Sequence, residues 1–218
     1  MNRYLNLILL AAGSGERFGS NKLRKDINGK PMYRHIFDHL NQYYREHAAD
    51  CEVTVVSQYS EILEAAEGAG FAAVRNSRPE DGISLTIRLG LEAGSENNPG
   101  KPASFDEDDQ YQGEGAVFFT ADQPYMCYQT VEKFLQQAHR TGKGILSAAN
   151  SGVSGNPVFF DRNYYPELME LTGDIGGKRV MNRHLDDVEW FEMSKEELMD
   201  IDTPENGDMS NRIRNLSE

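Results

Sequence analysis

The stretch LILLAAGSGERFGSNK at residues 7–22 decides the fold of this 218-residue chain. An aliphatic run leads into Ala-Ala-Gly, and glycines at positions 13, 15 and 19 then alternate with polar residues that include Arg17 and Lys22. Glycines let main-chain amides approach a phosphate closely because no Cβ intervenes. The stretch therefore predicts a buried strand that ends in a phosphate-binding loop.

Length and composition predict a single globular domain over residues 1–218. The short apolar run near the N-terminus leads straight into the glycine loop, so we expect a first strand of a cytoplasmic protein and not a secretory signal. No segment approaches the roughly 20 apolar residues of a membrane span. The two cysteines form no CxxC or spaced framework, so we expect a reducing compartment and no zinc site.

The charge is strongly uneven along the chain. The net charge of −13 argues against nucleic acid as a partner. Residues 1–34 nevertheless carry seven Lys or Arg against two acids, which leaves a charge of −18 on the remainder. An acidic body with one basic corner suits a small polyanion bound at that corner, although a chance cluster on a solvated face gives the same pattern.

Apolar runs alternate with helical patterns over the first 150 residues. We expect strands at 5–11, 52–57, 71–75, 116–121 and 144–149, and helices at 31–47, 59–70, 83–94 and 129–142. This alternation predicts an α/β fold with a mostly parallel sheet and helices on both faces. The later pattern is irregular, with strands at 157–160 and 188–193, helices near 163–171 and 176–184, and a final helix capped by Thr203.

Residues 95–115 are rich in acids, glycine and proline, which predicts a surface loop inserted before a core strand. Its DEDD run lacks the spacing and glycine of a calcium loop.

Two well-known phosphate loops do not match residues 7–22. A dinucleotide fingerprint needs G-x-G-x-x-G and an acid at the end of the second strand, but the third glycine falls one place late and that strand ends in Ser-Gln-Tyr. A P-loop needs Lys directly after Gly and before Ser or Thr, whereas Lys22 lies between Asn and Leu.

The remaining pattern, L-A-A-G-x-G-x-R-x-G-x-x-K, resembles the signature of nucleotidyltransferases. It is most similar to that of the molybdenum cofactor cytidylyltransferases and their guanylyltransferase relatives. Six further segments follow in the family's order: NGKPM (28–32), RPEDGISLTIRLGL (78–91), TADQP (120–124), SGNPVFF (154–160), GDIGGKRV (173–180) and DIDTPEN (200–206). The resemblance covers nearly the whole chain except the acidic loop, and it implies a Rossmann-like three-layer α/β/α fold.

The resemblance implies a nucleotide site at the glycine loop and at the start of the helix near residue 84. Its members are Leu10, Ala11, Ala12, Gly13, Ser14, Gly15, Arg17, Lys22, Gly82 and Ser84. Arg17 offers a planar fork for phosphate oxygens, and Lys22 offers a point charge for the leaving pyrophosphate. The alternatives are exposed loop cations for Arg17 and Lys22, and ordinary helix capping for Ser84.

A metal site is implied at Asp122, which closes the strand at 116–121. The resemblance implies that Asp122 and Asp202 hold Mg²⁺, a cation that prefers oxygen ligands. Asp200 competes with Asp202, and either residue is also suited to a purely structural role beside the helix cap. Asn156 and Asp174 fall in acceptor-side segments, and Asp174 also resembles a metal-side Asp of more distant cytidylyltransferases.

The implied reaction transfers CMP from CTP to the terminal phosphate of a molybdopterin-type cofactor and releases pyrophosphate. Arg17, Lys22 and Asp122 are the expected catalytic residues, and a molybdoenzyme or its maturation chaperone is a candidate partner. No histidine is needed as a base, because a phosphate acceptor is already mostly ionised at pH 7.

Three alternatives stay open: a guanylyltransferase of the same cofactor, a sugar-phosphate-type nucleotidyltransferase, and a non-catalytic molybdopterin-binding chaperone. The LAAG sequence favours the cytidylyl branch by resemblance. The sequence departs from the family pattern in two places: it has GDIGGKR in place of GDxGAR, and Thr86 in place of a second serine. These departures affect the expected contacts to the acceptor and to the nucleotide base.

Overall fold

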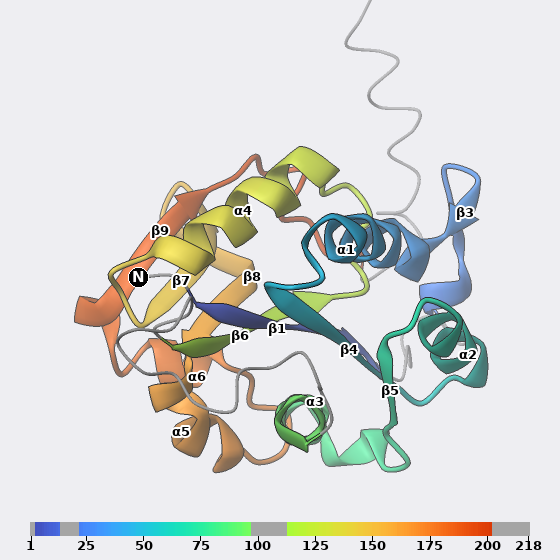
Figure 1. The fold of residues 1–218 in the computed structure, drawn as a ribbon, viewed down its shortest axis with the longest axis horizontal. Helices are drawn as coiled ribbons and strands as arrows, with labels where there is room; N and C mark the ends of the chain where they lie inside the picture. The colour runs from blue at the N-terminus through green and yellow to red at the C-terminus, as the bar shows by residue number, and fades with distance from the viewer. Residues whose placement is uncertain (1–2, 14–21, 97–112, 202–218) are drawn as a thin grey trace, which may run out of the picture.

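One sheet organises the computed structural model, which describes residues 3–13, 22–96 and 113–201. Seven strands of the described residues form it in the order β5-β4-β1-β6-β8-β7-β9 (Figure 1). Their bounds are β1 Tyr4–Ala11, β4 Cys51–Ser57, β5 Ala72–Arg75, β6 Glu114–Thr120, β7 Ile145–Asn150, β8 Val153–Asp161 and β9 Val188–Glu192. Only β8 runs antiparallel to its neighbours, so the expected mostly parallel sheet is confirmed.

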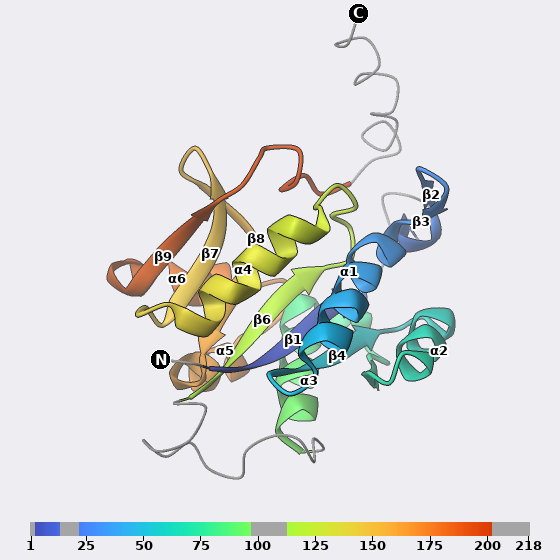
Figure 2. The ribbon, with the colours of Figure 1, turned by 45° about the horizontal axis from the view of Figure 1, so that its top comes forward.

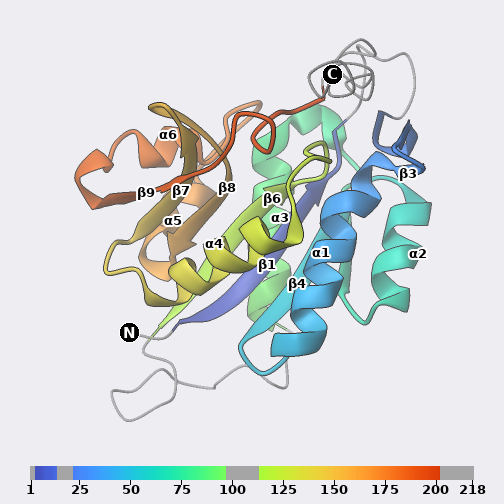
Figure 3. The same ribbon diagram turned by 90° about the horizontal axis from the view of Figure 1, so that it is seen from above.

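Helices cover both faces of the sheet. One face carries α1 (Met32–His47), α2 (Ser60–Gly68) and α4 (Tyr128–Arg140), and the other carries α3 (Ile83–Glu96), α5 (Tyr165–Met169) and α6 (Lys178–Met181) (Figures 1 and 3). A separate apolar cluster fills the space between the sheet and the helices on each of its two faces, so the three-layer α/β/α prediction is confirmed. Within the described residues, no helix combines the length and apolar composition that crossing a bilayer requires.

The first strand lies at the centre of this arrangement. All eight residues of β1 are buried, because parallel neighbours flank both edges and helices cover both faces. Such a strand is expected to be continuously apolar and not alternating. Its register pairs Leu10 with Thr120 and Ala11 with Ser57, so β1, β4 and β6 end at the same edge of the sheet.

A small hairpin precedes α1 and corrects the expected helix start. Strands β2 (Asp26–Ile27) and β3 (Lys30–Pro31) pair through a turn in which Asn28 and Gly29 have φ of 54° and 89°. An Asn-Gly pair favours such a turn because both positions need positive φ. Pro31 is therefore not the first helical residue: it is extended, with ψ of 140°, and α1 begins at Met32.

The second half of the chain has a longer strand and shorter helices than expected. Strand β8 runs from Val153 to Asp161, well beyond the PVFF segment, because it pairs with β7 along its length. Only α5 and α6 form α-helix where longer helices were expected. The predicted final helix after Thr203 lies outside the described residues.

The acidic segment is shorter than its expected bounds of 95–115. Helix α3 continues to Glu96, and β6 begins at Glu114. Glu114 tolerates a place in a buried strand because its carboxylate lies 3.5 Å from Arg162 Nη1. Residues 97–112 lie outside the described part of the chain.

A buried histidine ties three elements together at the far edge of the sheet. His139 Nδ1 donates to the carbonyl oxygen of Arg3 (2.6 Å), and its Nε2 accepts from the Tyr43 hydroxyl (3.1 Å). These bonds connect α4 to α1 and to the residue that precedes β1. Burial lowers the pKa of His139 below 6.5, which keeps the ring neutral, and burial likewise lowers the pKa of His35 and His39.

These histidines predict that stability falls on mild acidification. Their folded pKa values lie below the unfolded value, so the unfolded chain takes up protons first and the free energy of unfolding drops as pH falls through about 6.5. We expect His139→Gln to reduce this loss between about pH 7.5 and 5.5, by at most about 1.4 kcal/mol per pH unit. Urea unfolding at both pH values measures it. An unchanged pH dependence in the variant would show that His139 protonates equally in both states.

Candidate active site

The candidate site lies where β1, β4 and β6 end, an edge at which open α/β sheets bind ligands. Figure 2 shows these three strands side by side. The glycine loop leaves β1 after Ala11, and Asp122 follows the end of β6 by two residues. Three of the predicted site residues, Leu10, Ala11 and Ala12, are buried at this edge, and Gly13 is exposed.

An ion pair joins two of the predicted catalytic residues. Lys22 Nζ lies 2.7 Å from Asp122 Oδ2, and the two side chains are 13% and 20% exposed. The other oxygen of Asp122, Oδ1, is buried and has no hydrogen-bond partner among the described residues. Opposite charges thus join Lys22 to the segment that follows β6, and one carboxylate oxygen of Asp122 remains available for a ligand.

That free oxygen makes Asp122 suitable for a divalent cation. A buried carboxylate oxygen without a partner loses its hydration without compensation, which costs free energy until a ligand arrives. Mg²⁺ and Mn²⁺ accept such oxygen ligands. Among the described residues, Asp122 is therefore the side chain best placed to hold the metal that the family implies.

The C-terminal segment approaches the same aspartate. The amide of Ile201 donates to the backbone oxygen of Asp122 (3.0 Å), and Gln123 Nε2 donates to the carbonyl of Leu198 (3.1 Å). Asp200 is exposed. Four predicted site residues lie outside the described residues: Ser14, Gly15, Arg17 and Asp202.

Three consecutive side chains anchor the start of the glycine loop. Ser57 Oγ donates to the Ala11 carbonyl (2.8 Å), Gln58 Nε2 to the Ala12 carbonyl (2.9 Å) and the Tyr59 hydroxyl to the Gly13 carbonyl (2.9 Å). In the sequence, this Ser-Gln-Tyr run only argued against a dinucleotide fingerprint. Three polar residues at the end of a strand beside β1 were the available signal for this role.

The basic corner expected from residues 1–34 is only partly formed. Arg3 lies at the opposite edge of the sheet, where its Nε is 3.0 Å from Asp161 Oδ2. It lies there because residue 3 precedes β1, whereas the loop follows β1. Near the candidate site, Arg24 pairs with Glu61 (3.3 Å). Among the Lys and Arg residues of this segment that the structure describes, Lys22 is the one that pairs with Asp122.

The start of α3 is packed against the loop at residues 173–174. Gly82 has φ of 85°, and a Cβ there would lie 2.4 Å from the carbonyl carbon and oxygen of Gly173. The Ser84 amide donates to the same oxygen (3.2 Å), and the buried Ser84 hydroxyl has no partner among the described residues. Asp174 is exposed beside Gly82, and no measured contact brings it to Asp122.

A cavity of about 170 Å³ lies beside the ends of β1 and β6, where Leu10, Thr120 and the predicted site residue Asn156 line it. Apolar side chains form much of its wall, namely Leu10, Ile83, Ile87, Phe118, Val158, Phe160 and Met181. Polar groups in the wall include Thr120, Asn156 and Lys178, and the buried Thr120 hydroxyl has no partner among the described residues. The cavity thus joins Asn156 to the end of β6, two residues before Asp122.

A family model described as the MobA-like NTP transferase domain matches residues 7–188, from β1 to the start of β9. The chain belongs to this family. Membership confirms the expected reaction class, nucleotidyl transfer from an NTP. It does not select the branch of the family, and the matched range includes Lys22 and Asp122 but not Asp202.

Relatives of the MobA-like family differ in the substrates that their names give. The 2-C-methyl-D-erythritol 4-phosphate cytidylyltransferase of Rhodopirellula baltica is 27% identical over 182 residues, which cover 75% of this chain and 69% of the relative. The solved structure of Rv0371c from Mycobacterium tuberculosis has a TM-score of 0.68 at 18% identity over the full length of both chains, and a second structure of it is a complex with manganese.

A third relative carries a molybdopterin name. The molybdopterin-guanine dinucleotide biosynthesis protein A of Archaeoglobus fulgidus has a TM-score of 0.58 at 13% identity, over 97% of this chain and 99% of the other. At these identities the solved structures establish a shared fold.

The Gly82 contact predicts a severe effect of a single methyl group. Gly82→Ala combines positive φ with a clash against backbone, so we expect it to lower the free energy of unfolding by about 2–4 kcal/mol. Gly152→Ala is the matched control, because Gly152 has φ of 83° but open space around its Cβ position. Urea unfolding of both variants separates the clash from the backbone strain; equal losses would refute the close contact.

Proposed function

We propose that this chain transfers CMP from CTP to the terminal phosphate of a molybdopterin-type acceptor and releases pyrophosphate. The observation that carries the proposal is the Lys22–Asp122 pair at 2.7 Å, with Asp122 Oδ1 left without a partner among the described residues. It puts a cation for phosphate and a carboxylate for a metal at one point, beside the glycine loop. Arg17 and Asp202 complete the proposed set.

The proposed chemistry is an in-line displacement. A phosphate oxygen of the acceptor attacks the α-phosphorus of CTP, the bond from that phosphorus to the bridging oxygen breaks, and its electron pair leaves with pyrophosphate. A divalent cation, which we propose to be Mg²⁺, neutralises phosphate charge when bound by Asp122 and Asp202. Because the acceptor phosphate is ionised, the protein has to orient the reactants and stabilise negative charge.

Lys22 changes partners in this scheme. Without nucleotide its ammonium neutralises Asp122. When the triphosphate binds, the ammonium moves to the β- and γ-phosphate oxygens, while Gly13 and Gly15 let main-chain amides approach them. The positive charge then lies where negative charge grows on the leaving pyrophosphate.

The apolar cavity favours an acceptor with a flat ring system and disfavours a polyol acceptor. A cavity near 150 Å³ admits a benzene-sized ring, so the space between Leu10 and Phe160 suits part of a ring system. A polyol phosphate would leave several hydroxyls unpaired against Ile83, Ile87 and Phe118, which costs binding free energy. Asn156 and Lys178 are the proposed polar contacts at this cavity.

The second candidate is a cytidylyltransferase for a sugar or polyol phosphate. The observation in its favour is the 27% identity to a 2-C-methyl-D-erythritol 4-phosphate cytidylyltransferase. A guanylyltransferase of the molybdenum cofactor and a non-catalytic molybdopterin chaperone are the other outcomes of the test below.

The test measures pyrophosphate release and thermal stabilisation with CTP, GTP, ATP and UTP, each with Mg²⁺, and with molybdopterin or methylerythritol phosphate as acceptor. We expect release with CTP and molybdopterin. Lys22→Met should lower kcat by about 10²–10³-fold, and Asp122→Asn by at least as much, because both stabilise transition-state charge.

Asp38→Asn is the matched control, since it breaks a surface Lys–Asp pair of 3.0 Å between Lys30 in β3 and Asp38 in α1 and should leave kcat unchanged. Release with GTP in place of CTP would move the chain to the guanylyl branch. Pyrophosphate release with methylerythritol phosphate alone as acceptor would favour the second candidate. Binding of molybdopterin without pyrophosphate release from any nucleotide would favour the non-catalytic chaperone.

A further inference from the structure

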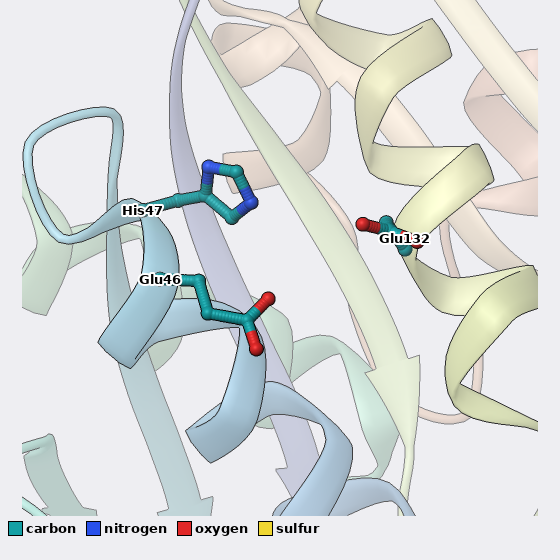
Figure 4. Close-up of side chains that lie close together, drawn as sticks. All are labelled: Glu46, His47 and Glu132. Carbon is teal, nitrogen blue, oxygen red and sulfur yellow. The ribbon is translucent and has the colours of Figure 1, made fainter.

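Two carboxylates and one imidazole converge between α1 and α4, away from the candidate active site. Glu46 and His47 are the last two residues of α1, and Glu132 lies in the second turn of α4. One potential ligand atom from each lies within 4.8 Å of the other two. Figure 4 shows the His47 ring and both carboxylates turned toward the space between the two helices.

The carboxylates are available to a ligand. Glu132 makes no hydrogen bond or ion pair among the described residues, although it is half-buried. Glu46 accepts from the Tyr128 hydroxyl (2.6 Å) and from Gln42 Nε2 (3.2 Å), and the first of these bonds lowers its pKa and keeps it ionised. Each oxygen retains a lone pair for a cation.

An acidic residue lies on the other side of the His47 ring. The Nδ1 atom of His47 lies 3.9 Å from Asp50 Oδ2, which is longer than a hydrogen bond. Metal-bound histidines commonly face a carboxylate with the ring nitrogen that does not bind the metal. Asp50 is placed for that role, and the Nε2 atom of His47 faces the side of Glu46 and Glu132 (Figure 4).

The surroundings favour a cation and are open to water. The C-terminal end of α1 carries the negative end of the helix dipole, which attracts positive charge. Glu46 is exposed, so water reaches the ligand atoms from solvent. An open cavity of about 290 Å³ adjoins His47 and Asp50 on the side of the ring away from the two glutamates. Its wall also contains His139 and Arg140, whose guanidinium limits the net negative charge.

We propose that Glu46, His47 and Glu132 bind one divalent transition-metal ion of the zinc type, which joins the end of α1 to α4. One imidazole nitrogen and two carboxylate oxygens suit Zn²⁺ with water as a fourth ligand, whereas Mg²⁺ and Ca²⁺ prefer oxygen ligands alone. Ligand atoms around a tetrahedral Zn²⁺ lie about 3.3 Å apart. The ligand atoms here lie within 4.8 Å of one another, so rotation of the two glutamate side chains has to bring their oxygens closer when the ion binds.

The site is independent of the proposed function. The spacing of the two cysteines predicted no zinc site, but the proposed ligands include no cysteine. Glu46 and His47 are adjacent in the sequence, but Glu132 follows some 85 residues later, so the three residues form no local sequence motif.

The experiment titrates the metal-free full chain carrying Asp122→Asn, which weakens the proposed catalytic metal site, with ZnCl₂ by calorimetry. Co²⁺ serves as a second probe, because its absorption spectrum reports nitrogen and oxygen ligation. We expect His47→Gln and Glu132→Gln each to weaken Zn²⁺ binding by at least about 100-fold. Asp50→Asn should weaken it by about 10- to 100-fold, as expected for a carboxylate that orients a ligand.

His184→Gln is the matched control, since it removes a histidine from another His–Glu contact, 2.6 Å from Glu167, where no third ligand is present among the described residues. It should leave Zn²⁺ affinity unchanged. Zn²⁺ should also raise the melting temperature of the parent but not of the Glu132→Gln variant. Equal binding by parent, His47→Gln and Glu132→Gln, or no binding by a folded parent at millimolar Zn²⁺, would overturn the site.

Discussion

The parallel pairing of β1 with β6 is the constraint on which the candidate site depends. Its register places Leu10 opposite Thr120, so the chain leaves both strands at the same height. That geometry brings Lys22 and Asp122, a hundred residues apart, to 2.7 Å. A shift of one residue would turn every side chain of β1 to the other face of the sheet. The buried Leu and Ile residues on both faces therefore hold the catalytic geometry as well as the fold.

The Lys22–Asp122 pair is suited to a site that must stay ready for a polyanion. A partly buried carboxylate and a partly buried ammonium stabilise each other without ligand, which avoids two uncompensated charges. The pairing is incomplete, because Asp122 Oδ1 has no partner among the described residues. Under the proposed function, a nucleotide carrying its cation would supply a partner to both groups at once.

The sequence predicted what depends on local pattern. The strands near 5–11, 52–57 and 116–121 and the helices between them were visible as apolar periodicity, because a buried strand and an amphipathic helix each have a characteristic period. The antiparallel β8 was not visible at its full length. Its residues 154–156 are Ser-Gly-Asn, which have low strand propensity, and this part of β8 forms a strand because it pairs with β7, a tertiary interaction. The Asn28–Gly29 pair is a hairpin signal, but the prediction began the helix at Pro31, which belongs to β3.

The candidate site also has one part that depends on local sequence and another that depends on tertiary packing. The glycine loop and Asp122 are legible because each is a short motif at the end of one strand, and its chemistry follows from residues next to one another. The cavity beside Asn156 has walls from β1, β6, β8, α3 and α6, so its apolar character is a property of the assembled fold. The hydrogen bonds from Ser57, Gln58 and Tyr59 to the loop carbonyls are likewise contacts between strands. Nucleotidyl transfer is therefore indicated by local motifs in this chain, whereas the cavity beside Asn156 depends on the packing of segments that lie far apart in the sequence.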